Sequence, residues 1–108
     1  MENSFPTMGK TRAHTVRMQL TDSSQLLSAA VDAALGEAVY WQGVRSAMIT
    51  CETYDCRISF GAAATTAIGH ILYVGQSIRV PSNDMVSGAH LINKTAGQNA
   101  IIQVTLEY

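Results

Sequence analysis

The fold is decided by the stretch Ala100-Ile101-Ile102-Gln103-Val104-Thr105-Leu106-Glu107-Tyr108. Every second side chain, from Ile102 to Tyr108, is apolar or aromatic, while most of those between are polar. This period of two predicts a β-strand with one buried face. The same alternation runs from Ala13 to Leu20, where Val16, Met18 and Leu20 share one side. The sequence therefore predicts half-buried strands near both of its ends.

Between these two strands the sequence alternates short apolar runs with turn residues. Runs rich in β-forming residues occupy 44–53, 56–60, 70–74, 77–80 and 89–93, and Gly, Pro, Asn or Asp separate them. Short strands at intervals of about ten residues are typical of sandwiches and barrels. We therefore expect a mainly β fold, either a β-sandwich or a jelly-roll-like barrel.

One short helix and one arm complete the expected organisation. Apolar residues recur at helical spacing from Leu26 to Leu35, and Gly36 ends the run. An irregular connection with closely packed alanines is the alternative. Residues 1–12 show no periodicity and predict an extended N-terminal arm. We expect residues 13–108 to form a single β-sandwich domain.

The composition favours contact with partners over catalysis or nucleic-acid binding. Hydrophobic residues make up 47% of the chain and charged residues only 14%, against about 25% in ordinary domains. We therefore expect part of the surface to be buried against partners. The Lys and Arg residues are scattered, so we expect no direct nucleic-acid contact. No apolar run reaches the roughly 18 residues of a membrane helix, and no signal peptide is visible.

The sequence contains no recognisable set of catalytic, cofactor-binding or metal-binding residues. No serine lies in a Gly-x-Ser-x-Gly elbow, and His14, His70 and His90 have no acidic neighbour in sequence. Phosphate-binding glycine loops are also absent. We therefore expect a protein that is not an enzyme and that needs no cofactor.

Cys51 and Cys56 admit two interpretations. They could pair as a disulfide across a tight hairpin, or they could be ordinary cysteines of a strand or turn. A zinc site would need a second pair of ligands, which the sequence does not offer. The second interpretation is favoured, and the pairing stays open.

The aromatic residues also admit two interpretations. Tyr40 and Trp41, together with Phe60, Tyr73 and Tyr108, could form a carbohydrate-binding platform. They could equally anchor the core or a protein interface, where Trp and Tyr are enriched. The second reading is favoured, and a carbohydrate-binding surface module remains an alternative function.

Three stretches resemble small β-sandwich structural proteins of tailed bacteriophage virions. They are Cys56-Arg57-Ile58-Ser59-Phe60-Gly61, the run from Thr65 to Ile78 that contains Gly69-His70-Ile71-Leu72, and the final strand from Ala100 to Tyr108. The resemblance covers residues 38 to 108 and implies a capsid decoration or cement subunit on the virion surface, made in the host cytoplasm. It implies binding to the major capsid protein as a dimer or trimer. A tail or head–tail adaptor component is the alternative.

The expected contact elements are the arm, residues 1–12, and the loops 61–69 and 81–88. Together with the aromatic pair Tyr40 and Trp41, the candidate contact residues are Phe5, Pro6, Arg12, Thr65, Thr66, Asn83 and Met85.

Overall fold

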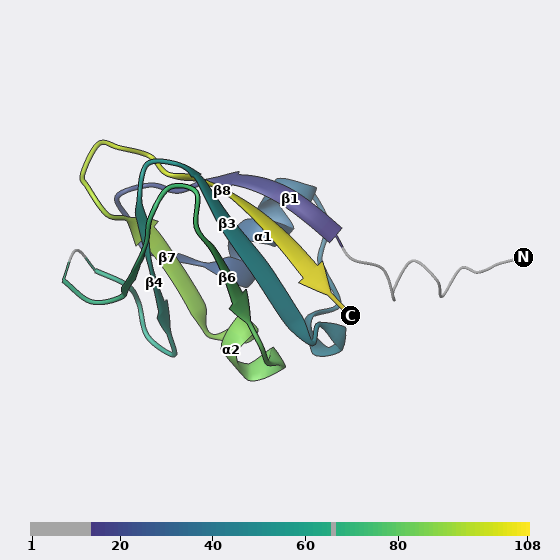
Figure 1. Ribbon diagram of the computed structural model, residues 1–108. Helices are drawn as coiled ribbons and strands as arrows, with labels where there is room; N and C mark the ends of the chain where they lie inside the picture. The colour runs from purple at the N-terminus through teal and green to yellow at the C-terminus, as the bar shows by residue number, and fades with distance from the viewer. Residues whose placement is uncertain (1–13, 66) are drawn as a thin grey trace, which may run out of the picture.

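A computed structural model of the protein describes residues 14–65 and 67–108. The strands form two antiparallel sheets (Figure 1). Two short α-helices and one 3-10 turn, η2, lie between the strands. In chain order the elements are β1 (His14–Gln19), β2 (Gln25–Leu26), α1 (Leu27–Leu35), η2 (Trp41–Gly43), β3 (Ser46–Thr53), β4 (Cys56–Phe60), β5 (His70–Leu72), β6 (Ser77–Val80), α2 (Asn83–Ser87), β7 (Ala89–Asn93) and β8 (Ile101–Glu107).

The strand pairing is nested, so that strands near the two ends of the sequence pair with each other and strands near its middle do the same. One four-stranded sheet has the order β1-β8-β3-β6, and the other has the order β2-β7-β4-β5. The first strand therefore pairs with the last, β2 with β7, β3 with β6, and β4 with β5. The mainly β prediction is confirmed, and both sheets contribute to one hydrophobic core.

The alternation of β8 appears in the structure as alternate burial. Ile102, Val104 and Leu106 are fully buried, whereas Gln103 and Thr105 lie on the opposite face. The strand lies between β1 and β3, so its inward side chains meet both neighbours' inward side chains in the core. The strand thus has an interior position in its sheet, with its apolar side chains in the core.

The helix expected from Leu26 to Leu35 is present as α1. Leu27 and Val31 are buried one turn apart, which gives the helix its inner face. Gly36 ends it with a φ of 74°, a left-handed conformation that glycine adopts without steric cost. Its N–H donates to the Asp32 carbonyl at 2.9 Å. The helix packs against β1 and β7 (Figure 1).

The expectation of a single helix is wrong, because residues 83–87 form a second one. The sequence Pro81-Ser82-Asn83-Asp84 predicted only a turn. Instead the Ser82 hydroxyl accepts a hydrogen bond from the Met85 N–H at 3.3 Å, which caps α2, and Val86 is fully buried. A turn signal and a helix N-cap use the same residue types, and the burial of Val86 decides between them.

The loop 61–69 packs on its own chain. Ala64 is buried, and its N–H donates to the Ser24 hydroxyl at 3.0 Å, far away in sequence. The Ser59 hydroxyl donates to the Ala62 carbonyl at 2.6 Å. Part of the small-residue stretch expected to face a partner therefore covers the protein's own sheet. The predicted arm, residues 1–12, lies outside the described residues.

Candidate binding groove

The space between the two sheets is filled by aliphatic side chains. Buried polar side chains in the described part of the chain are limited to Ser46, Ser59 and Asn93. Within residues 14–65 and 67–108, no group of three or more His, Cys, Asp or Glu side chains could hold a metal ion. A binding site must therefore be sought on the surface rather than between the sheets.

A groove of about 520 Å³ runs between the edge of β1 and the exposed side of α1. This volume falls within the range of ordinary ligand sites. Its lining is mostly apolar with three polar side chains, and consists of Arg17, Met18, Gln19, Gln25, Leu26, Ala29, Ala30, Ala33 and Ala34.

The wall formed by β1 is a free strand edge. Among the described residues, β1 pairs with β8 and with no second strand. The Leu20 N–H donates to the Ala100 carbonyl at 2.7 Å, which continues the register of this pair. In an antiparallel pair only alternate residues direct their backbone groups at the partner. The N–H and C=O groups of Thr15, Arg17 and Gln19 consequently point away from β8, towards the free edge.

The wall formed by α1 is made of small side chains. Ala29, Ala33 and Ala34 are exposed, and Ala30 is half-buried. Alanine is the strongest helix former. These positions therefore favour the helix, and their short side chains project little into the groove. Leu26, which is 37% exposed, adds a larger apolar side chain beside the first turn. Extended chain could approach the β1 edge closely here without meeting bulky side chains.

Arg17 is the one charged side chain in the lining of this groove. Its guanidinium lies 3.6 Å from the Glu52 carboxylate, and the two side chains are 62% and 41% exposed. Glu52 also accepts a hydrogen bond from the Gln103 side chain at 3.3 Å. An ion pair this exposed contributes little to stability, so the arginine is available to another carboxylate.

Three of the predicted contact residues contact other parts of the same chain. The Trp41 indole N–H donates to Asp32 Oδ1 at 3.0 Å, and the ring packs against the core. The Asn83 amide donates to the carbonyls of Trp41 and Val44, both at 2.7 Å. Met85 packs against the core as well. These three residues hold η2 and α2 to the sheets.

The remaining contact candidates divide between exposed and undescribed positions. Tyr40 is 61% exposed. The Thr65 hydroxyl accepts hydrogen bonds from the N–H groups of Ala67 and Ile68, at 3.1 and 2.9 Å, and so shapes its own loop. The other candidates, Phe5, Pro6, Arg12 and Thr66, lie outside the described residues.

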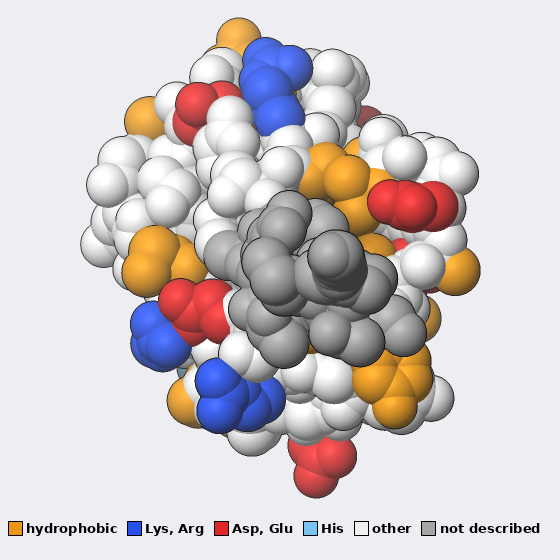
Figure 2. All heavy atoms as spheres, turned by 90° about the vertical axis from the view of Figure 1, so that its right-hand side faces the viewer, with side chains coloured by type: hydrophobic (Ala, Val, Ile, Leu, Met, Phe, Trp, Pro, Cys, Tyr) orange, Lys and Arg blue, Asp and Glu red, His pale blue; other side chains and the backbone are white. Residues whose placement is uncertain are grey.

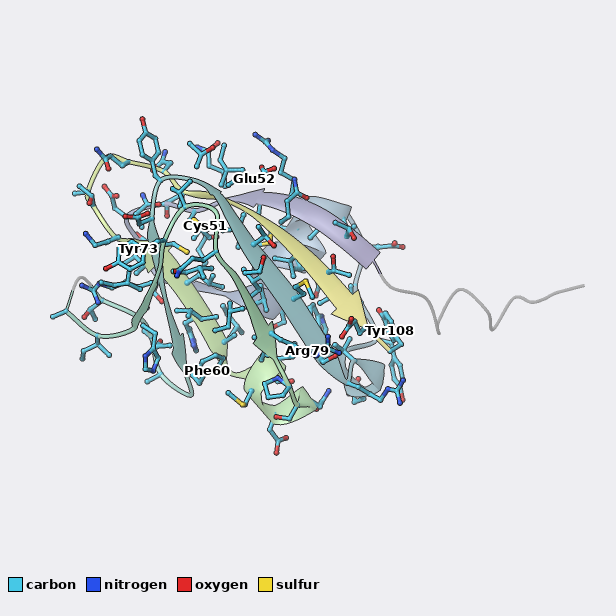
Figure 3. All side chains as sticks on the ribbon, viewed as in Figure 1. Cys51, Glu52, Phe60, Tyr73, Arg79 and Tyr108 are labelled. Atoms are coloured by element: carbon cyan, nitrogen blue, oxygen red, sulfur yellow. The ribbon has the colours of Figure 1, made fainter. Side chains whose placement is uncertain are left out.

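The aromatic residues do not form a shared platform. Figure 3 shows Tyr73 at one end of the molecule and Tyr108 at the other, with Phe60 at the lower edge. Tyr73 belongs to the turn after β5, while Tyr108 follows β8. Phe60 and Tyr108 pack partly against the core. The rings of Tyr40 and Tyr108 both lie close to Gly43, but the five aromatic residues together do not form one platform, so the arrangement does not support the carbohydrate-binding alternative.

The surface charges are dispersed. On the face that Figure 2 displays, Lys and Arg side chains form separate small groups rather than a continuous basic field. Arg79 and Glu107 form an ion pair on the outer face of the first sheet. No helix within the described residues is both long and apolar enough to cross a membrane.

Cys51 and Cys56 are both buried free thiols. The Cys51 thiol donates to the Tyr54 carbonyl at 2.9 Å. Burial raises the pKa of Cys56 to about 12, and the nearby Cys51 adds to this shift. Burial also raises the pKa of Cys51. Because the thiolate is the reactive form, both cysteines are poor nucleophiles at neutral pH.

No protein-family model matches the sequence, and no curated protein matches it. A solved structure of an HTH_3 family transcriptional regulator from Vibrio cholerae is similar, with a TM-score of 0.55 and 18% sequence identity. The match covers 96% of this chain and 47% of the regulator, so the chain spans about half of that protein's length. At this identity the likeness shows a shared fold.

This likeness contradicts the resemblance to virion proteins of bacteriophages. The expected capsid decoration function, its tail-adaptor alternative and the virion location are therefore wrong. The stretches that carried the resemblance contain the strands β4, β5 and β8 and the turns beside them. Their spacing is a property of short antiparallel strands in general, which is why it pointed to the wrong proteins.

Proposed function

We propose that the two sheets form a jelly roll, and that this jelly roll is a protein-binding module without a reaction of its own. The nested pairing of β1 with β8, β2 with β7, β3 with β6 and β4 with β5 supports the jelly roll. The aliphatic filling between the sheets supports a role in binding at the surface.

The binding site in this proposal is the groove between β1 and α1, and its occupant is an extended segment of another protein. The observation that carries the proposal is the edge of β1, where the backbone groups of Thr15, Arg17 and Gln19 face an apolar groove and pair with no strand of the described chain. A peptide can add to such an edge as a further strand, with its side chains in the adjacent groove. Exposed edges of this kind otherwise invite aggregation, so an occupant also protects the sheet.

The similarity to a transcriptional regulator does not extend the proposal to DNA. The regulator's family is named for a helix-turn-helix, a motif of two helices joined by a short turn. In this chain α1 and α2 are separated by four strands and η2. The proposal therefore concerns contacts between proteins.

A display library of random peptides tests the groove as a binding site. We expect the wild type to enrich peptides of alternating apolar and polar residues. The variant Ala33→Trp fills the groove from α1 and should weaken binding of the enriched peptides by at least about tenfold, while the far-UV circular dichroism spectrum stays unchanged. Ala96→Trp, an exposed substitution in the loop before β8, serves as the control and should bind like the wild type.

Enriched peptides that bind equally well to both tryptophan variants would contradict the groove as the site. A library that yields no binder to the wild type would contradict the protein-binding function itself. The expectation of a homo-oligomer stays a prediction, and sedimentation across a range of concentrations measures it directly.

A further inference from the structure

We propose that the segment bound in the groove is acidic, with a carboxylate placed opposite Arg17 and apolar residues on both sides of that carboxylate. This inference rests on the proposed function, because it names the chemistry of the partner that occupies the same groove. Three observations carry it: the charge of the lining, the alternation of side chains along β1, and the small residues of α1.

The charge of the groove selects the sign of the partner. Arg17 lies in the middle of the three residues whose backbone faces the free edge, and the lining contains no acidic side chain. Antiparallel pairing with β1 of a second copy, centred on this residue, would place two Arg17 side chains opposite each other. Like charges directly opposite are destabilising across strands. An acidic residue at that position in another protein is stabilising for the same reason.

The alternation of β1 determines which partner residues face which way. Thr15, Arg17 and Gln19 point to the polar outer face of the sheet, whereas Val16 and Met18 point inward. Residues that lie directly opposite each other on two paired strands point to the same face of the sheet. The partner's carboxylate therefore lies on the outer face beside Arg17, and the residues before and after it point inward.

The inward residues of the partner meet the exposed face of α1. Ala29, Ala33 and Ala34 leave space above the helix, and burial of apolar surface there drives binding. β-branched apolar residues such as valine suit both the strand conformation and the available depth. The partner segment is thus expected to read apolar–acidic–apolar.

The ion pair with Glu52 lowers the attraction that Arg17 offers. In the free protein the Glu52 carboxylate lies 3.6 Å from the Arg17 guanidinium. The carboxylate of an incoming segment must compete with Glu52 for this guanidinium. The variant Glu52→Gln removes this competitor and should tighten binding of an acidic segment by about twofold. The Gln103 contact remains available to the new amide.

A capped peptide of six residues, the length of β1, tests the inference. The probe is acetyl-Val-Thr-Val-Glu-Val-Thr-amide, and its control carries lysine in place of glutamate. We expect the wild type to bind the glutamate probe about two- to fivefold more tightly than the lysine probe, as measured by calorimetry. Arg17→Gln should abolish this difference, and Arg17→Glu should reverse it. High salt should reduce it, since exposed charges are screened.

The matched control is Arg79→Gln, which removes an ion-paired arginine from β6, the strand at the opposite edge of the same sheet. It should leave the preference for glutamate unchanged. Equal binding of both probes that is still lost in Ala33→Trp would overturn the acidic partner and leave the groove function standing. Absence of binding by the glutamate probe, or binding that Ala33→Trp does not affect, would overturn the inference as well.

Discussion

Two regions of the molecule use polar groups in opposite ways. At one end, the buried Asn93 side chain donates to Asp22 Oδ1 at 2.9 Å and to Asn99 Oδ1 at 2.8 Å, and accepts from the Ala100 N–H at 2.9 Å. In the groove, the backbone of Thr15, Arg17 and Gln19 faces an apolar wall without a neighbouring strand in the described chain. The polar groups of the first region are hydrogen-bonded within the chain, whereas the backbone groups of the second have no strand partner among the described residues.

The difference teaches where binding capacity lies in this fold. The cluster of Asp22, Asn93 and Asn99 resembles a functional site. Its donors and acceptors, however, form hydrogen bonds with other groups of the same chain. These hydrogen bonds connect the β1–β2 loop to the β7–β8 loop. The groove contains hardly any distinctive side chain, but backbone N–H and C=O groups along its β1 edge have no strand partner within residues 14–65 and 67–108. Mutations should therefore separate the two regions, with stability lost in one and binding lost in the other.

The largest effect is expected from Asn93→Ala. This change removes three side-chain hydrogen bonds and leaves the buried Ala100 N–H without its acceptor. The free energy of unfolding should fall by about 3 kcal/mol, measured by urea denaturation. Binding of the acidic probe at temperatures where the variant is folded should stay as in the wild type. A loss of binding without a loss of stability would erase the contrast between the regions.

A smaller effect is expected from Asp32→Ala on α1. The Asp32 carboxylate accepts hydrogen bonds from the Val39 N–H at 2.9 Å and from the Trp41 indole at 3.0 Å. Both donors are partly buried, so the free energy of unfolding should fall by about 1–2 kcal/mol. Asp84→Ala, an exposed carboxylate on α2, is the control and should change it by less than about 0.5 kcal/mol. Equal losses in the two variants would show that the Asp32 contacts do not fasten α1.

The smallest effect is expected from the titration of Asp22. Hydrogen bonds from the Asn93 side chain, and then from the Gly97 N–H, hold the pKa of Asp22 below its ordinary value of 3.8. A lowered pKa means that the ionised form stabilises the fold above this value, and that the stabilisation is lost as the pH falls through the lowered pKa. The melting temperature of the wild type should therefore decrease slightly more steeply below about pH 4 than that of Asp22→Asn. Parallel curves would contradict this role of the carboxylate.

The strands and α1 were largely predictable from the sequence because their signals are local. Alternation located β1 and β8, and Gly36 marked the end of α1. The second helix was missed because its burial through Val86 depends on the tertiary structure. Strand order was beyond the sequence for the same reason, since pairing of β1 with β8 joins residues that are distant in the chain.

The candidate site was not predictable in this way. Trp41 and Asn83 attracted attention as large or polar residues near turns, and their polar groups turned out to be used internally. The groove depends on which strand is at the edge and which face of α1 is exposed. The only local sign was the run of alanines from Ala29 to Ala34, a pattern that also suits close packing within a core.

The position of β8 between β1 and β3 has a consequence for how the sheet folds. Among the described strands β1 pairs with β8 alone, whereas β3 pairs with both β8 and β6. β1 therefore gains its strand partner only when two segments that are far apart in the sequence meet, and such contacts are the slowest kind to establish. Removal of residues 101–107 would therefore leave β1 without its strand partner and β3 paired with β6 alone, and the edges exposed in this way would favour aggregation.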